Sequence, residues 1–348
     1  MQTQNSVTLL LHGENDTLIW GMTNAERIRR LVEKLQSKTT GNLWVNLAYV
    51  FDPQWIRYVH DNPGTIVTMD GVPVLAHLRA EDDAEALAAL RIPTGARVLE
   101  YQDKPRIHNP ALRKLETPFV RDLTPATVKY IERQSYFGAY KGVTDILTKY
   151  LWPELALVLT RFAARIGMTP NMVTSIGAIG CIGAIFLFYY GYFWTGMAAG
   201  FVFMVLDTVD GKLARCTITS SFWGNIFDHG LDLVHPPFWW VAWAFGLGTA
   251  GLALPDEQFR LVMIVILGGY VLQRIIEGIF MRAFGQHIHV WRPMDSWFRL
   301  ITARRNPNMV LLFVSMMFGR PDIGLIAVAW WTLISLAVHM IQIMQAAI

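Results

Sequence analysis

The sequence contains 348 residues, of which 53% are hydrophobic and only 16% are charged. This balance is too apolar for an ordinary water-soluble protein of this length and indicates a membrane protein. The formal net charge is only +3, and no run of Lys and Arg alternates with aromatic residues, so nucleic acid is not an expected partner. Two cysteines, Cys181 and Cys216, are too few for a disulfide framework or a cysteine-based metal site.

The first third of the chain holds many of the charges and alternates strand-like with helix-like patterns. Strands are predicted at 7–11, 43–51, 65–69 and 72–78, and helices at 24–35 and 81–90. We therefore expect residues 1–104 to form a small α/β domain. The N-terminus lacks a basic start followed by an apolar stretch and a cleavage site, so this domain is expected in the cytoplasm.

Two segments are expected to connect this domain to the membrane. Residues 105–143 contain several prolines beside scattered charges, without a sustained period, which is typical of a linker. Residues 144–167 mix Leu, Trp and Phe with charged side chains, which predicts an amphipathic helix at the membrane interface.

The rest of the membrane domain, which we place at 144–348, is a series of long apolar runs. Six transmembrane helices are predicted, of which the fifth is short, at 172–192, 194–213, 224–249, 259–283, 307–319 and 322–347. Basic residues crowd one connection, at Arg282, Arg292, Arg299, Arg304 and Arg305. Because basic loops stay inside, the sequence predicts a multi-pass protein of the inner, cytoplasmic membrane with both termini in the cytoplasm.

Four carboxylates lie at or near the cytoplasmic ends of two predicted spans. Asp207 and Asp210 are three residues apart, and Asp228 and Asp232 are four apart, so each pair projects from one helix face. Charged groups at such positions are costly and would repel one another, unless hard divalent cations bind between them. The pattern indicates a two-metal carboxylate site that holds a diphosphate for phosphoryl transfer.

Two neighbouring residues suit a phosphate ligand. Gly211 lets the helix backbone approach a ligand closely, and Arg215 offers a planar fork of donors to phosphate oxygens. A polar helix interface with ion pairs to Lys212 and Arg215 is the plainer alternative, but two cations cannot neutralise four carboxylates.

The complete spacing Asp207-x-x-Asp210-Gly211-x-x-Ala214-Arg215, eight residues, then Gly224-x-x-x-Asp228-x-x-x-Asp232, resembles the signature of the CDP-alcohol phosphotransferase family. Thr169-Pro170-Asn171 is similar to the segment that this family uses near its cytidine pocket, so the resemblance covers about residues 135–348.

This resemblance implies a reaction and a set of roles. A phosphoalcohol passes from a CDP-alcohol donor to an alcohol or alcohol-phosphate acceptor, and CMP is released in phospholipid or polar-lipid synthesis. The implied metals are Mg²⁺ or Mn²⁺, bound in a two-metal site on the cytoplasmic side. The implied partners are membrane lipid and a second copy of the chain in a homodimer. The implied residues are Asp207, Asp210, Asp228 and Asp232 for the metals, Asp232 as the base for the acceptor hydroxyl, and Asn171, Gly211 and Arg215 for the CDP part.

The N-terminal domain also resembles a known type of module. The segment 19–27 between the first strand and helix is similar to domains fused to inositol-phosphate-type members, which look like sugar nucleotidyltransferases. However, residues 12–16 place acids where a triphosphate would need cations, and no Gly-rich phosphate loop is present. We expect a degenerate, non-catalytic module that docks on or stabilises the membrane domain, and it favours inositol-phosphate chemistry.

Several alternatives stay open. The acidic set could be the permeation site of a divalent-cation transporter, or the membrane part could only anchor the N-terminal domain. His287 and His289 form a His-x-His pair, although no third ligand is evident for zinc. Basic residues could bind an acceptor phosphate or merely follow the positive-inside rule, at Arg274, Arg282, Arg304 and Arg305.

Overall fold

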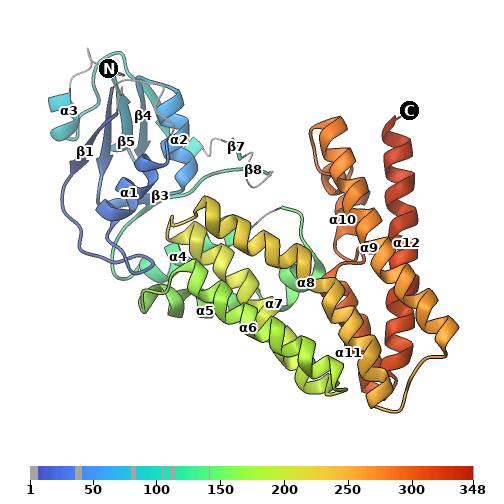
Figure 1. The fold of residues 1–348 in the computed structure, drawn as a ribbon. Helices are drawn as coiled ribbons and strands as arrows, with labels where there is room; N and C mark the ends of the chain where they lie inside the picture. The colour runs from blue at the N-terminus through green and yellow to red at the C-terminus, as the bar shows by residue number, and fades with distance from the viewer. Residues whose placement is uncertain are drawn as a thin grey trace, which may run out of the picture. The chain divides into compact units, whose positions relative to one another are not determined.

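The computed structural model describes residues 7–35, 41–79, 84–103, 106–109, 114–140 and 142–347. The chain divides into two compact units, both drawn in Figure 1. Unit 1 comprises 1–142, 161–168 and 212–219, whereas unit 2 comprises 143–160, 169–211 and 220–348.

Unit 1 contains an α/β layer, as the sequence predicts. Its sheet has five strands in the order β1-β2-β5-β4-β6, in which the β1–β2 and β4–β6 pairs are parallel and the other two pairs are antiparallel. Its elements are β1 (Thr8–His12), α1 (Asn24–Glu33), β2 (Asn42–Asn46), β3 (Tyr49–Phe51), α2 (Pro53–Asp61), β4 (Thr65–Met69), β5 (Val72–Leu78), α3 (Ala84–Ala88), β6 (Arg97–Glu100), the 3₁₀ turn η1 (Tyr101–Asp103), β7 (Ile107–Asn109), β8 (Lys114–Glu116), β9 (Val120–Asp122) and α4 (Val128–Gly138).

The single strand predicted at 43–51 is two strands, followed by a helix that the sequence reading missed. β2 belongs to the main sheet, whereas β3 pairs with β9 in a separate two-stranded sheet. Helix α2 begins where Asp52 accepts a hydrogen bond from the Gln54 amide and Pro53 occupies the first turn, an ordinary helix start. Its Trp55 is fully buried in the core.

Residues 114–138, expected to be part of a linker, instead contain secondary structure that packs within unit 1. β9 completes the sheet with β3, and the Trp55 Nε1 donates to the Pro118 carbonyl at 3.0 Å. In α4, Glu132 is buried and accepts hydrogen bonds from the Trp20 amide and from Arg161 Nε. Prolines interrupt the periodic pattern of apolar residues, but they do not prevent packing against distant parts of the chain. The linker prediction, which rested on composition, was therefore wrong for these residues.

Two polar residues of the segment that resembles a nucleotidyltransferase serve the fold of unit 1. Asn24 is fully buried and donates to the carbonyls of Leu47 and Tyr49, and Arg27 donates to the Phe51 carbonyl at 2.8 Å. They satisfy backbone carbonyls in and next to β3. These contacts give both side chains a structural role.

Unit 2 is helical. Its elements are the π-helical turn η2 (Leu147–Leu151), α5 (Pro153–Arg165), whose last turn belongs to unit 1, α6 (Pro170–Tyr189), α7 (Phe193–Cys216), whose C-terminal end also belongs to unit 1, α8 (Phe222–Thr249), α9 (Asp256–Phe284), the 3₁₀ turn η3 (Ile288–Val290), α10 (Pro293–Arg299), α11 (Arg305–Met317) and α12 (Pro321–Ala347). The helix predicted at 144–167 is therefore broken at Trp152, between η2 and α5.

Small residues allow the helices of unit 2 to pack closely. A Cβ at Gly246 of α8 would lie 1.8 Å from the Phe188 carbonyl of α6, so no larger residue fits there. On α6, a Cβ at Gly180 would lie 3.2 Å from the Ala199 carbonyl of α7. These contacts confirm that small residues on α6 serve helix packing, the ordinary arrangement in membrane bundles.

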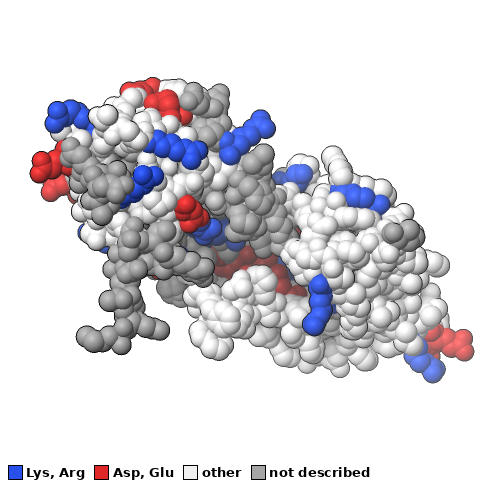
Figure 2. Space-filling model, turned by 90° about the horizontal axis from the view of Figure 1, so that it is seen from above, with Lys and Arg blue, Asp and Glu red and all other residues white. Residues whose placement is uncertain are grey.

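Unit 2 has the surface of an integral membrane protein. Within the residues that the structure describes, α6, α9 and α12 are long and apolar enough to cross a membrane. Large apolar side chains on these helices are exposed, for example Ile179 at 72%, Ile264 at 69% and Trp330 at 64%. Figure 2 shows that most of the visible surface over α9 to α12 carries neither acidic nor basic residues. Contact of so much apolar surface with water is unfavourable, whereas contact with lipid chains is not.

Candidate active site

Helices α7 and α8 bring three of the predicted carboxylates together. Asp207 lies on α7, and Asp228 and Asp232 lie one turn apart on α8. One carboxylate oxygen from each residue lies within 4.8 Å of those of the other two. The structure thus brings together three of the four carboxylates that the spacing predicts to converge.

Asp210, the fourth predicted carboxylate, has a separate buried environment. It is 3% exposed and accepts a hydrogen bond from the Thr174 hydroxyl of α6 at 2.5 Å. This hydrogen bond fixes the Asp210 side chain on the α6 side of α7. Asp210 is not in the group of three whose oxygens converge.

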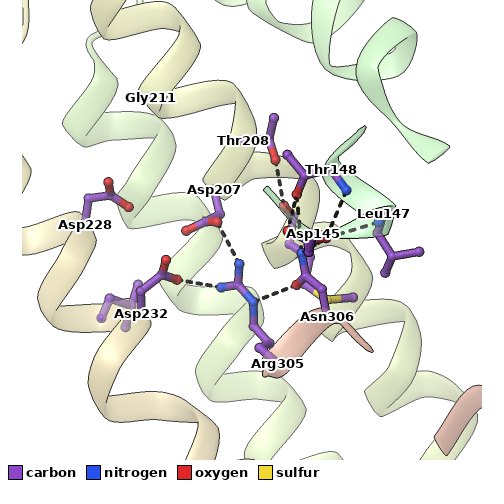
Figure 3. Close-up of polar contacts among 12 residues, drawn as sticks. Asp145, Leu147, Thr148, Asp207, Thr208, Gly211, Asp228, Asp232, Arg305 and Asn306 are labelled. Carbon is purple, nitrogen blue, oxygen red and sulfur yellow. Dashed lines mark hydrogen bonds and ion pairs between the residues drawn. The ribbon is translucent and has the colours of Figure 1, made fainter. Parts of the chain in front are cut away.

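Arg305, the first residue of α11, binds two of the converging carboxylates (Figure 3). One of its terminal nitrogens lies 2.7 Å from Asp207 Oδ2, and the other lies 2.6 Å from Asp232 Oδ1. Its guanidinium also lies over the Phe203 ring at 4.9 Å. From the sequence, Arg305 was expected only as a phosphate ligand or as a basic residue of a cytoplasmic loop, so its contact with these carboxylates was not predicted.

A chain of hydrogen bonds fixes the orientation of Arg305. Its Nε donates to Asn306 Oδ1 at 2.9 Å, and Asn306 Nδ2 donates to Asp145 Oδ1 at 2.9 Å. Asp145 also accepts bonds from the Leu147 and Thr148 amides at the start of η2 (Figure 3). Burial raises the pKa of Asp145, but the bonds from Asn306 and Thr148 outweigh it and hold this pKa below its ordinary value.

The residues predicted to hold the CDP part are distributed around these helices. Asn171 lies in the first turn of α6, and a Cβ at Gly224 of α8 would come within 2.8 Å of its Oδ1. Gly211 follows Asp210 on α7 and lies in the same close-up as the carboxylates (Figure 3). Arg215 lies on the part of α7 that belongs to unit 1, so its predicted contact with the site stays a prediction.

A second polar cluster, which we call the basic cluster, consists of Arg274, Glu277, His289, Arg299, Arg304 and His339. Glu277 accepts bonds from Arg274 and Arg304, and His289 Nε2 lies 3.2 Å from its Oε1. Arg304 precedes Arg305 in the chain, so consecutive arginines contact the basic cluster and the carboxylate site.

Several buried nitrogens of the basic cluster have no hydrogen-bond partner among the described residues. They are Arg274 Nε, Arg304 Nε, Arg299 Nη1, His289 Nδ1 and both ring nitrogens of His339. Burial, followed by the nearby Arg304 guanidinium, lowers the pKa of Arg299. Unpaired buried donors are costly, and they indicate that an anion completes this cluster.

Zinc does not fit the basic cluster. Glu277, His289 and His339 place ligand atoms within 4.8 Å of one another. However, arginines already bind both Glu277 oxygens, and Arg304 Nη2 lies 3.3 Å from His289 Nε2. A cation here would be repelled by two guanidiniums, so the weak zinc interpretation of the His-x-His motif gains no support.

The carboxylate site, in contrast, fits a hard divalent cation. It offers only oxygen donors from Asp207, Asp228 and Asp232, the chemistry that Mg²⁺ and Mn²⁺ prefer. These three side chains are 16%, 26% and 44% exposed, so a ligand reaches them from solvent. The fold and this site together define a helical membrane protein with an acidic metal-binding centre.

Residues 167–294 match the family model described as CDP-alcohol phosphatidyltransferase. This segment contains all four aspartates of the site together with Asn171, Gly211 and Arg215. The family resemblance is thus confirmed for this part of the chain as a match to that family model.

Curated relatives match parts of the chain. Cholinephosphotransferase 1 of Danio rerio is 32% identical over 127 residues, 33% of this chain and 32% of that protein. Phosphatidylinositol phosphate synthase of Streptomyces avermitilis is 39% identical over 93 residues, 26% of this chain and 38% of that protein. The synthase of Mycobacterium marinum is 30% identical over 144 residues, 39% of this chain and 56% of that protein. The chain thus spans from a third to about half of these relatives.

Among solved structures, phosphatidylinositol phosphate synthase of Mycobacterium tuberculosis with CDP-DAG bound matches 54% of this chain and 92% of that chain. The identity is 17% and the TM-score is 0.43.

Sequence reasoning missed three residues that order the site. Thr174 binds Asp210, and Asn306 and Asp145 orient Arg305. Thr174 follows Asn171 by three residues, which is a usable signal for a shared helix face. No local pattern relates Asp145 to Asn306, because 161 positions separate them.

Proposed function

We propose that this protein is a CDP-alcohol phosphotransferase of phospholipid or polar-lipid synthesis, which releases CMP. The observation that carries the proposal is the convergence of Asp207, Asp228 and Asp232 from two helices, inside the segment that matches the family. The relatives named as cholinephosphotransferase and phosphatidylinositol phosphate synthase support the same class of reaction.

The carboxylates would hold two Mg²⁺ or Mn²⁺ ions, with Asp210 as the fourth carboxylate of the set. Bound metals neutralise charge on the diphosphate of the donor and on the departing CMP. Asn171, Gly211 and Arg215 would hold the CDP part, in keeping with the place of Asn171 beside Gly224.

Asp232 would act as the base. It is the most exposed of the three converging carboxylates, so an acceptor hydroxyl can reach it. As the hydroxyl oxygen forms a bond to the β-phosphorus, its proton passes to the Asp232 carboxylate. The bond between the β-phosphorus and the bridging oxygen breaks, and CMP leaves with the electron pair.

The acceptor in this proposal carries a phosphate, as in the inositol-phosphate type. Arg274, Arg299 and Arg304 surround one carboxylate, Glu277, and retain buried donors without partners. A phosphate would satisfy these donors. Since Arg304 adjoins Arg305 in the chain, an acceptor held there lies beside the carboxylates.

The proposed membrane arrangement adds three further spans to α6, α9 and α12, which are long and apolar enough to cross. α7, α8 and α11 would complete six spans, with the site at the cytoplasmic face of an inner membrane. α7 and α8 are long enough to cross, but their aspartates reduce their apolarity. The assembly would be a homodimer, as the family resemblance implies, and unit 1 a non-catalytic module.

The test uses the full chain in detergent and follows CMP release with Mg²⁺, Mn²⁺ or EDTA. CDP-diacylglycerol is paired with inositol and with inositol phosphate, and CDP-alcohols with soluble head groups are paired with lipid acceptors. We expect metal-dependent CMP release that Asp232→Asn and Asp228→Asn each lower by at least ~100-fold. Asp256→Asn, at the exposed start of α9, is the control and retains activity.

The same assay separates the alternatives. If CMP release occurs but phosphorylated acceptors are no better than free alcohols, only the assignment of the basic cluster fails. The transporter interpretation predicts Mg²⁺ flux in liposomes and no CMP release from any pair. That combination would refute the enzyme proposal.

A further inference from the structure

Arg305 supplies positive charge to the carboxylate site, as a bound divalent cation would. Its two terminal nitrogens bind Asp207 and Asp232, two of the three residues whose oxygens converge. We propose that Arg305 is a built-in counter-cation, which holds the site together without metal and must leave both carboxylates before metal binds between them. This inference rests on the metal site of the proposed function.

Charge explains why the arginine and the metal exclude one another. Carboxylates packed this closely repel, so an empty site needs a neutralising cation. The Arg305 side chain is only 12% exposed, so water screens its charge poorly. A divalent ion on the same oxygens would meet a buried positive charge at short range, and the two cations would repel each other.

The anchor of Arg305 limits how far the guanidinium can move. Its Nε is bound to Asn306, which Asp145 holds in turn, and neither contact involves the metal-binding oxygens (Figure 3). Because the guanidinium is planar and rigid, its three nitrogens move together, so release from Asp207 and Asp232 also shifts the Nε bond to Asn306. The freed donors stay beside the site, where a planar guanidinium suits the oxygens of a bound diphosphate.

This exchange also gives Asp232 two states. While Arg305 binds its Oδ1, the Asp232 carboxylate is a weaker base toward the proton of an acceptor hydroxyl. Departure of Arg305 would remove this ion pair, so the strength of the base would depend on whether the site is loaded. The arginine thereby couples metal binding to formation of the catalytic arrangement.

The experiment measures Mn²⁺ binding directly, by the electron paramagnetic resonance signal of free Mn²⁺ during titration of detergent-purified protein. The samples are wild type, Arg305→Gln, Arg305→Lys and the control Arg320→Gln. Arg320 is also paired with an aspartate, Asp322, but its side chain is 52% exposed and contacts no residue of the site. Arg305→Gln is expected to bind Mn²⁺ about tenfold more tightly, Arg305→Lys to lie between, and Arg320→Gln to match wild type.

Thermal unfolding provides a second readout. Arg305→Gln should unfold at a lower temperature than wild type in EDTA and recover in Mn²⁺, because metal replaces the missing cation. If the variant does not fold in EDTA, it is purified in Mn²⁺ and the rate of Mn²⁺ release to excess EDTA is measured. Slower release than wild type supports the inference.

Two results would overturn the inference, and they are distinguishable. Equal or weaker Mn²⁺ binding by Arg305→Gln, or equal or faster release, shows that the arginine does not compete with metal while the site itself stands. Absence of Mn²⁺ binding by wild type removes the proposed metal site and the inference with it.

Discussion

At the scale of single residues, the carboxylate site depends on polar groups that hold each aspartate in a defined position. Asp207 and Asp232 share Arg305, whereas Asp210 depends on Thr174. Buried carboxylates without such partners are strongly destabilising, so these neighbours belong to the site as much as the aspartates do.

Removal of the Thr174 hydroxyl tests this view. Thr174→Val preserves shape but leaves an Asp210 oxygen without its donor, so we expect a loss of about 1–3 kcal/mol in unfolding free energy. The measurement is thermal unfolding in detergent. Thr332→Val is the matched control, because that buried hydroxyl donates only to the Val328 carbonyl of its own helix. Equal effects of both substitutions would contradict a special role for the Thr174–Asp210 bond.

At the scale of helices, the close approach of α8 to the start of α6 is set by a residue without a side chain. A Cβ at Gly224 would lie 2.8 Å from Asn171 Oδ1 and 2.9 Å from Ser221 Oγ. Asn171 Oδ1 ends a flexible side chain and would move, whereas Ser221 Oγ caps α8 by accepting a hydrogen bond from the Gly224 amide at 3.0 Å. A side chain at position 224 would therefore displace the Asn171 side chain more than it would disturb the fold.

Gly224→Ala should accordingly weaken donor binding with little change in stability. We expect the KM for the CDP-alcohol to rise several-fold, by roughly 1 kcal/mol of lost binding, while the unfolding temperature stays near wild type. Gly248→Ala, on the same helix with open space around its Cβ, is the control. An unchanged KM in the Gly224 variant would remove Asn171 from the donor site.

The turn before α5 is held by Asp145, which yields a prediction about pH. The folded pKa of Asp145 lies below its ordinary value, because hydrogen bonds from Asn306 and Thr148 outweigh burial. The ionised carboxylate therefore stabilises the fold above its unfolded pKa, and this contribution is lost as pH falls through the folded pKa.

Asp145→Asn should thus be destabilising by about 1–3 kcal/mol at pH 7, and the difference from wild type should shrink as pH falls below about 4. Unfolding temperatures of both proteins between pH 7 and pH 3 measure this. A constant difference across that range would show that the ionised form is not the stabilising one.

At the scale of the whole molecule, exposed apolar helices and basic connections determine how the chain meets the membrane. The described spans α6, α9 and α12 have lipid-facing surfaces, and arginines gather between α9 and α11. The proposed orientation places the start of α9 outside the cytoplasm and its end inside.

Labelling of single cysteines tests this orientation. Cys181 and Cys216 are both buried, so they provide a low background. In intact cells, an impermeant maleimide should label Asp256→Cys and should reach Arg282→Cys only after the membrane is opened. The reverse pattern would invert the proposed topology, and labelling of both positions would argue that α9 does not cross the membrane.

The comparison of expectation and structure differs between the two units. Apolar runs predicted α6 to α9, and carboxylate spacing predicted a convergence of four aspartates, because helix periodicity places residues three and four apart on one face. Three of them converge, whereas Asp210 binds Thr174. In unit 1 four strands of the main sheet were predicted, whereas β6, α2, β9 and α4 were missed or assigned to a linker. Their short segments carry little periodic signal and are stabilised by contacts distant in sequence.

The spacing of residues along the chain therefore predicted the class of this protein and a set of candidate site residues. Tertiary structure alone decided the partners of those residues: Thr174 for Asp210, Arg305 for Asp207 and Asp232, and the basic cluster that gathers arginines from α9, α10 and the start of α11. The physical reason is that the spacing of like charges, and hence their repulsion, follows from the sequence. The group that neutralises them depends on helix packing, which brings distant positions together.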